Sequence, residues 1–325
     1  MTDRSFRTSI TDCDVSLGVA EIAAAVRKDA LVGGQVMRAQ SIGRCGPTLG
    51  EELVIEPRRG WIAINAREMW HHRELLFFLI WRDVKVRYKQ TVLGVAWAVL
   101  VPVLSMLVFT VIFGNFAGLK DTLPAGLRNA YPVYVYAGLL PWLFFSNAIS
   151  LGGLSLVNQQ QLLTKIYFPR LFVPTATVGG GLVDMGISFC IFAGLMAVYG
   201  ITPSMGIIFL LPLVSLTVVA SLGIAFLLSA LTVSYRDFKF VIPFLVQIWQ
   251  FLSPVVYPST IVPERYRWLL ALNPLTGIVD GFRSALLGTP PPWLSVGISS
   301  LSTVALFTLG LLYFRNAERR FADIA

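Results

Sequence analysis

Long stretches of this chain carry no charged side chain. No Asp, Glu, Lys or Arg occurs in the intervals from Lys89 to Lys120, Arg128 to Lys165, Asp184 to Arg236, Lys239 to Glu264 and Arg283 to Arg315. A bilayer core requires about 20 mostly apolar residues per helix. A soluble domain cannot bury so many long apolar runs, so the sequence predicts an all-α, multi-pass membrane protein.

The composition excludes several other classes of protein. Only 14% of the 325 residues are charged and the net charge is +8, a basic excess that cytoplasmic loops of membrane proteins explain. No basic run is interleaved with aromatic residues in the manner of single-strand binding, so we expect no nucleic-acid partner. The three cysteines lack CxxC spacing, and His71 and His72 are adjacent and point apart on a helix. We therefore expect no metal site.

The apolar runs predict six spans. Their approximate limits are Leu93–Phe116, Pro132–Val157, Leu171–Tyr199, Met205–Val233, Phe240–Tyr257 and Trp293–Phe314. Lys and Arg are most frequent before span one, in the loops after spans two and four, and in the C-terminal tail. By the positive-inside rule these segments are cytoplasmic, and so are both termini.

Two segments outside the spans have their own character. Residues 1–55 form a polar N-terminal extension that we expect to be weakly ordered, and they lack the pattern of a signal peptide. Residues 56–91 contain a predicted helix, Ala66–Tyr88, in which an aromatic stripe lies beside a basic face. Such a helix usually lies in the headgroup plane, although it is also consistent with the first turns of span one. Residues 92–325 are the predicted six-span domain.

The segment between spans five and six is too long for a turn and too apolar for a mobile loop. Two short helices are predicted at Arg265–Leu272 and Thr276–Leu287. They are separated at Asn273–Pro274, because proline disfavours helix in the residue before it. We expect an external re-entrant pair, since non-helical backbone is tolerated within a membrane where protein buries it.

Asp184 lies inside the third predicted span. An intramembrane carboxylate is costly, and a functional role is the default hypothesis. A proton-coupled transporter would use such a group, whereas a structural role would hydrogen-bond it within the bundle. The chain has no GxxxxGK[ST], HExxH or GxSxG motif. We therefore expect no enzyme activity and no cofactor in this chain, and any ATP and Mg²⁺ would be bound by another subunit.

Two further features suggest contacts with other molecules. The loop Asn158–Pro174 predicts a short cytoplasmic helix that docks on a partner, or an interfacial loop with snorkelling Lys165 and Arg170. Aromatic residues are dense, and they serve interface belts and core packing or, because sugars stack on aromatic faces, line a polymer conduit. The candidates for such a conduit are Trp97, Trp142, Phe144 and Phe145.

Four separated segments resemble the ABC-2 type permease family, which supplies the membrane subunit of polysaccharide-exporting ABC transporters. They are RELLFFLIWRDVKVRYKQTVLGVAWAVLVPVLSMLVFTVIFG (Arg73–Gly114), YAGLLPWLFFSNAI (Tyr136–Ile149), LLTKIYFPRLFVP (Leu162–Pro174) and LNPLTGIVDGFRSALLG (Leu272–Gly288). The resemblance extends from about residue 56 to the C-terminus, and the O-antigen exporters are the most similar type.

The resemblance implies an assembly and a set of roles. Two permease copies would pair with two ABC ATPase subunits in the bacterial inner membrane and export a glycan carried on undecaprenyl diphosphate among the membrane lipids. A gate helix would place four cations near the diphosphate: Arg82, Lys85, Arg87 and Lys89. A coupling helix would dock on the ATPase through Gln161, Lys165, Ile166, Tyr167, Phe168, Pro169 and Arg170. An external gate would contain Asn273, Pro274 and Arg283.

Other functions remain open from the sequence. Within the same family, the cargo could be a capsule polysaccharide, a teichoic acid, or a small lipid or drug. Outside it, a proton-coupled secondary transporter would rely on Asp184, and a membrane-embedded glycosyl- or acyltransferase would need a catalytic acid or base in a cavity. Secondary transporters often show internal repeats, and no repeat is evident in the sequence.

Overall fold

The computed structural model describes residues 70, 72–89, 94–161, 168–202 and 204–318. The predicted extension 1–55 lies outside these residues, as does part of the predicted interfacial segment. The described elements are all helical: α3 (Arg73–Lys89), α4 (Gly94–Phe109), η1 (Thr110–Phe116), η2 (Leu119–Thr122), α5 (Ala125–Arg128), α6 (Tyr131–Asn158), α8 (Phe172–Val198), η3 (Met205–Phe209), α9 (Leu210–Ser234), α10 (Phe238–Leu252), η4 (Ser259–Ile261), α11 (Glu264–Ala271), α12 (Pro274–Leu287) and α13 (Trp293–Glu318).

Five of the described helical stretches are long and apolar enough to cross a membrane. They are Ala96–Phe116, Tyr131–Asn158, Phe172–Val198, Met205–Ser234 and Trp293–Glu318. Helices satisfy every backbone hydrogen bond internally, which is the condition for crossing lipid. The chain is therefore a multi-pass, all-helical membrane protein, as the charge-free runs predict.

The fifth predicted span is shorter than expected. It was predicted to reach Tyr257, but α10 ends at Leu252 and has 15 residues, or roughly 22 Å of helix. Ser253 adopts an extended backbone, the conformation favoured before a proline such as Pro254. By length and composition, the described residues thus contain five candidate spans rather than six, and α10 is a shorter apolar helix.

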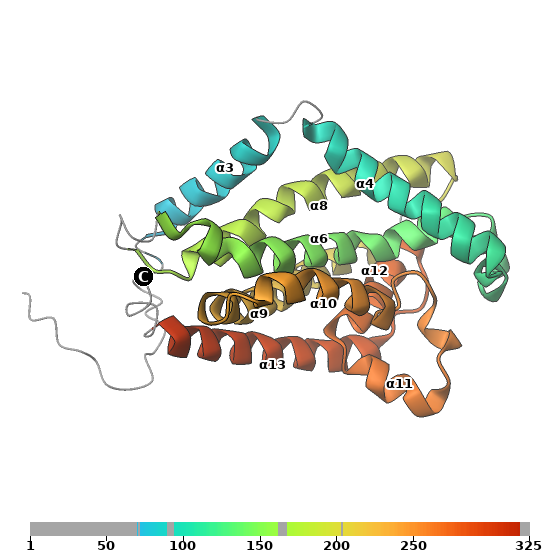
Figure 1. The fold of residues 1–325 in the computed structure, drawn as a ribbon. Helices are drawn as coiled ribbons and strands as arrows, with labels where there is room; N and C mark the ends of the chain where they lie inside the picture. Colours follow the sequence, from blue (N-terminus) through green and yellow to red (C-terminus); the bar gives the residue numbers. More distant parts are fainter. Residues whose placement is uncertain (1–69, 71, 90–93, 162–167, 203, 319–325) are drawn as a thin grey trace, which may run out of the picture. The chain divides into compact units, whose positions relative to one another are not determined.

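Helix α6 is the centre of the bundle. It packs against α8, α9, α10 and α12 (Figure 1), and it has the largest buried share of the candidate spans. Gly152 and Gly153 allow close approach of α9, because a Cβ atom there would lie 2.8 Å from Ala225 Cβ and 3.1 Å from Leu228 Cβ. The span that contains α4 is the opposite case, since it has the smallest buried share of the candidate spans, 11%.

Besides the main hydrophobic core around α6, a second hydrophobic cluster lies at one end of the bundle. Leu79 of α3, Phe168 before α8, Phe226 of α9 and Phe314 of α13 are all buried in it. Figure 1 shows α3 and the C-terminal end of α13 at this end of the bundle and α11 at the other. The cluster therefore connects the basic helix to the loop that precedes α8.

Candidate functional site

Helix α3 packs along the first half of α8. Its packed face carries Leu79, which is buried, and Ile80, whose Cδ1 atom would lie 2.9 Å from a Cβ atom built at Gly179. The predicted aromatic stripe (Phe77, Trp81, Val84 and Tyr88) lies only partly on the packed face, since Phe77 is 69% and Trp81 is 52% exposed whereas Tyr88 contacts α8. Small residues on α8 admit the α3 side chains, and this selects the face that docks.

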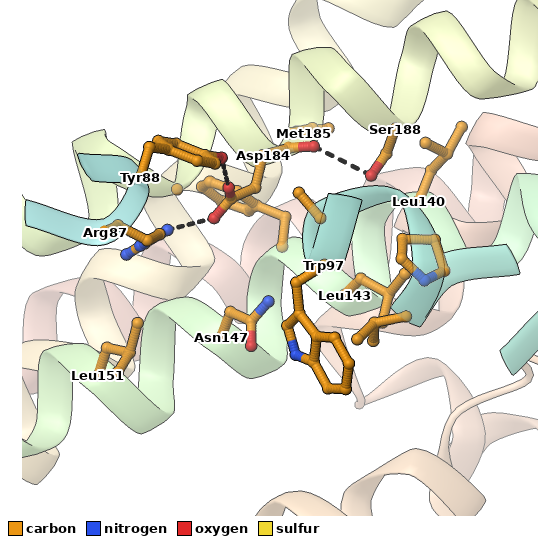
Figure 2. Close-up of a pocket in the computed structure, with 15 residues that line it drawn as sticks. Arg87, Tyr88, Trp97, Leu140, Leu143, Asn147, Leu151, Asp184, Met185 and Ser188 are labelled. Carbon is orange, nitrogen blue, oxygen red and sulfur yellow. Dashed lines mark hydrogen bonds and ion pairs between the residues drawn. The ribbon is translucent and has the colours of Figure 1, made fainter. Parts of the chain in front are cut away.

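The last turn of α3 is joined to α8 by a carboxylate. Arg87 Nη1 forms an ion pair with Asp184 Oδ2, and the Tyr88 hydroxyl donates to Asp184 Oδ1. Figure 2 shows both side chains directed at Asp184. Burial raises the pKa of the Tyr88 hydroxyl, and the hydrogen bond to Asp184 acts in the same direction. Tyr88 therefore remains a neutral hydrogen-bond donor to this carboxylate.

This joint sets where α3 meets α8. Asp184 lies 12 residues beyond Phe172, the first residue of α8, or roughly 18 Å along the helix. The last turn of α3 therefore lies beside the middle of α8. Pairing with Arg87 gives the carboxylate inside this apolar helix a charged partner.

A cavity of about 700 Å³ opens beside this joint. Its walls come from α3, α4, α6 and α8, and they include Asn147 of α6 and Trp97 of α4, whose ring Figure 2 shows directed away from Asp184. The rest of the lining is mostly apolar: Ala98, Val101, Pro102, Leu140, Leu143, Phe144, Leu151, Gly181 and Met185, with Ser188. The cavity is thus apolar with one polar, charged end.

A second cavity of about 700 Å³ adjoins the first and is more polar. Arg82 lies at its edge, where its Nη2 atom donates to Asp83 Oδ1 at 2.8 Å and to Gln159 Oε1 at 2.7 Å. Other lining residues are Val86, Arg87, Leu151, Ser155, Asn158, Gln161 and Thr177. Lys85 and Lys89 are exposed on α3 outside these linings. Of the predicted gate-helix cations, Arg82 and Arg87 therefore line the cavities.

The loop before α8 is described only in part. Lys165, Ile166 and Tyr167 lie outside the described residues. Gln161 is exposed, and Phe168 is 7% exposed within the second hydrophobic cluster. Pro169 is half-buried, and Arg170 Nη1 donates to the Glu318 carbonyl at 3.5 Å. The described end of the loop is thus anchored to α13.

The two predicted helices between α10 and α13 are present as α11 and α12, close to their predicted limits. Asn273 caps α12 and Pro274 follows it as the first helical residue. The Asn273 side chain also accepts from Trp249 Nε1 at 3.0 Å and donates to Ser253 Oγ at 2.8 Å. It therefore ties α12 to the end of α10.

Arg283 is buried and satisfies the non-helical backbone after α10. Its Nη1 and Nη2 atoms donate to the carbonyls of Pro254 at 2.8 Å and Val255 at 2.6 Å. Its guanidinium carbon lies 4.0 Å from the centre of the Tyr134 ring. Its Nη1 atom lies 3.7 Å from Asp280 Oδ1. In this state Arg283 is an internal crosslink between α12, α6 and the segment after α10.

The predicted conduit aromatics divide into two groups. Trp142 and Phe145 are buried inside one copy of the chain, and Phe145 packs edge-on against Trp249 at 5.2 Å between ring centres. Within a single chain these two rings belong to the hydrophobic core. Trp97 is 57% exposed, and both Trp97 and Phe144 line the first cavity.

Sequence reasoning missed Asn147 and the partners of Asp184. The signal for Asn147 was available, because it is the single amide inside the apolar run of α6 up to Leu156. The pairing of Asp184 with Arg87 and Tyr88 had no local signal. Within the described residues, no three His, Cys, Asp or Glu side chains are grouped so as to hold a metal ion.

Comparison with known proteins gives a consistent result. The sequence model of the family described as "ABC-2 type transporter" matches residues 74–287. The chain is 30% identical to the O-antigen export system permease protein RfbA of Myxococcus xanthus, over 79% of this chain and 97% of that protein. It is 26% identical to the protein of the same name from Klebsiella pneumoniae, over 77% and 95% of the two chains. It is 28% identical to the polysialic acid transport protein KpsM of Escherichia coli, over 74% and 92%.

Proposed function

Because the chain belongs to the ABC-2 type transporter family, we propose that it is the permease subunit of an ABC exporter for a lipid-linked polysaccharide of the O-antigen type. Its relatives are named for O-antigen export and for polysialic acid transport. A capsule polysaccharide is the second candidate within this class. The bacterial inner membrane is the location that this function implies.

The observation that carries the proposal is the position of a basic helix, α3, beside two adjoining cavities, of which one is mostly apolar and the other is more polar. Helix α3 places Arg82 and Arg87 on the linings of the two cavities, with the apolar walls of α4, α6 and α8 on one side. Arginine suits the phosphates of a lipid carrier such as undecaprenyl diphosphate. Lys85 and Lys89, exposed on the same helix, add positive charge that attracts such an anion.

The power source in this proposal is external. Two copies of the chain pair with two ABC ATPase subunits, which bind ATP and Mg²⁺ and dock on the loop 159–170. Phe168 and Leu79 share one buried cluster, and Arg82 bonds to Gln159. Movement of the loop would therefore be passed to α3 by packed contacts, as in rigid-body switching.

The same proposal sets the membrane topology. Helix α10 and the segment after it make the sixth crossing, with the backbone at Pro254 and Val255 satisfied by Arg283 as buried non-helical backbone requires. Helices α11 and α12 form the external re-entrant pair. An even number of crossings then leaves both termini in the cytoplasm.

The pairing of Asp184 disfavours a proton-coupled transporter. Both oxygens of Asp184 accept from α3, one from Arg87 and one from Tyr88. These contacts give Asp184 a structural role at the joint between α3 and α8. Export that requires an ATPase subunit and survives collapse of the proton gradient is expected, and uphill transport by the chain alone on a pH gradient would contradict the proposal.

The decisive experiment uses a deletion strain and two matched variants. Loss of the chain should abolish surface polysaccharide while the lipid-linked glycan accumulates inside the cell. Lys85→Glu combined with Lys89→Glu reverses two exposed charges on α3 and should cut surface glycan by about tenfold or more. Lys239→Glu, an exposed charge in the first turn of α10, is the control and should export normally. Normal export in the α3 variant would remove the proposed role of this helix.

A further inference from the structure

The two cavities beside α3 are contiguous. Both are lined by Arg87 of α3 and Leu151 of α6. One cavity extends between α4, α6 and α8, and the other extends toward the end of α6 at Asn158 and Gln159. Arg87 therefore stands at the boundary between them.

The chemistry of the linings changes across this boundary. On one side the walls are aliphatic and aromatic, as at Val101, Leu143 and Phe144. On the other side the lining is polar, with Asn158 exposed and with Ser155, whose hydroxyl donates to the Gly152 carbonyl and keeps its lone pairs as acceptors. Binding sites of this volume are typically apolar with a few placed polar groups. An apolar region, an arginine and a polar region therefore follow one another along the two cavities.

Each arginine at this boundary is held by an aspartate. Arg82 pairs with Asp83 at 2.8 Å, and Arg87 pairs with Asp184. All four side chains retain between 17% and 32% of their exposure, so neither pair is sealed from an incoming ligand. Partly exposed ion pairs are weak, whereas a phosphate group offers the planar guanidinium two acceptor oxygens and more negative charge than a carboxylate. A phosphate is therefore able to replace the carboxylate.

We propose that the two cavities form one binding site for an amphiphile in which a hydrocarbon chain, a diphosphate and a sugar follow one another, and that Asp184 holds the position of a phosphate when the site is empty. This inference rests on the proposed function, because the lipid carrier of the cargo has that order of groups. The chain occupies the cavity between α4, α6 and α8, the diphosphate lies at Arg87 and Arg82, and the first sugar meets Asn158 and Ser155.

The proposal also gives ligand binding a mechanical consequence. When a phosphate takes Arg87 from Asp184, the last turn of α3 loses its charged contact with α8. Leu79 and Ile80 still pack on the bundle and Tyr88 still donates to Asp184, so α3 stays docked but has one contact fewer with α8. The cargo itself then weakens the attachment of the helix that lies beside the cavity.

The first test measures ligand binding to the full chain assembled with its ATPase subunits in lipid nanodiscs. The probes are farnesyl diphosphate, farnesol and inorganic pyrophosphate. Farnesyl diphosphate should bind at least about tenfold more tightly than either half alone. Phosphatidylglycerol, which has a chain and one phosphate, should compete poorly. Equal competition by phosphatidylglycerol would overturn the assignment to a diphosphate carrier.

The placeholder role of Asp184 predicts the sign of a mutational effect. Asp184→Asn removes the competing charge but keeps the shape, so the dissociation constant for farnesyl diphosphate should fall by about threefold to tenfold. A carboxylate with only a structural role would leave binding unchanged or weaker. Asp83→Asn applies the same test at Arg82 if the first variant does not assemble. Unchanged or weaker binding in the variants that assemble would overturn the placeholder assignment.

The position of the chain is tested by filling the cavity. Ala98 lines the apolar cavity, whereas its neighbour Val99 is exposed and does not. Ala98→Trp should weaken farnesyl diphosphate binding by about tenfold or more and leave pyrophosphate binding unchanged, because only the chain is displaced. Val99→Trp is the control. Equal binding by both variants would show that the chain lies elsewhere.

The sugar position has its own probe. A farnesyl diphosphate that carries one hexose should bind more tightly than farnesyl diphosphate, and Asn158→Ala should abolish that difference. Failure of these binding tests while the deletion strain still loses surface glycan would reject the site and leave the proposed function standing. Normal surface glycan in the deletion strain would instead reject the function.

Discussion

Arg87 of α3 and Asp184 of α8 form an ion pair although 97 residues separate them in the sequence. Tyr88 donates to the other oxygen of the same carboxylate. One acid thus fixes the last turn of a basic helix against the middle of an apolar one. The pair accounts for the intramembrane carboxylate and determines which way α3 enters the bundle.

Exchanging the two charges tests this relationship. Asp184→Arg and Arg87→Asp alone each place like charges together and should lower stability by about 1–3 kcal/mol. The double variant restores opposite charges and should recover much of that loss. Thermal unfolding in detergent measures stability, and the export assay should stay low in the double variant because α3 then carries an acid at position 87. Purely additive losses would show that the two residues do not interact.

The crossing of α9 and α13 depends on Gly310. A Cβ atom at this position would lie 1.9 Å from the Gly223 carbonyl oxygen, which is backbone and cannot rotate away. Gly310→Ala should therefore destabilise the protein by about 1–3 kcal/mol or more. Gly297→Ala on the same helix meets nothing within 4 Å and is the matched control, with an expected gain of up to about 1 kcal/mol. Melting temperatures of the two variants measure this difference, and Gly310→Ala should melt at the lower temperature. Equal melting temperatures would contradict the observed crossing.

Arg283 should be among the least replaceable cations of the chain. Arg283→Gln shortens the side chain, leaves the carbonyls of Pro254 and Val255 without their donor and leaves Asp280 unpaired in a buried site, with an expected loss of about 3–5 kcal/mol. Arg267 on α11 is exposed, and Arg267→Gln should change stability by less than about 0.5 kcal/mol. The yield of folded protein by size-exclusion chromatography measures both. A well-folded Arg283→Gln variant would show that the crosslink is dispensable.

The burial of the aromatic residues is open to chemical labelling. In a background with Cys13, Cys45 and Cys190 replaced by serine, Trp97→Cys should react readily with N-ethylmaleimide. Trp142→Cys should react at least about tenfold more slowly, because local opening must precede modification. Comparable rates would mean that Trp142 faces an open conduit in the assembled transporter.

The sequence predicted the architecture more securely than the site. The charge-free runs located the long helices to within a few residues, and Asn273–Pro274 predicted the break between α11 and α12. The fifth span was overextended to Tyr257, because Val255, Val256 and Tyr257 are as apolar as a membrane helix. Their backbone is not helical, since Arg283 supplies the hydrogen bonds that a helix otherwise makes internally.

The face of α3 that docks on α8 could not be predicted from the periodicity of its apolar residues. Apolar residues surround this helix between Leu75 and Trp81, so no single stripe is marked. The glycines of α8 select the face with Leu79 and Ile80, and Asp184 selects Arg87 from among the cations. In the same way, the sequence does not distinguish Trp142 from Trp97, because both are tryptophans in apolar runs. Trp142 is buried because α6 lies at the centre of the bundle, and Trp97 is exposed because α4 lies at its surface.

The spacing of charges along the chain is enough to predict a helical, multi-pass membrane protein, because a charged residue is costly at almost any position within a bilayer. Which cation meets Asp184, which aromatic rings are buried and where the cavities lie are visible only in the folded protein. Those outcomes depend on contacts between helices distant in sequence, and residue order along one helix does not encode them.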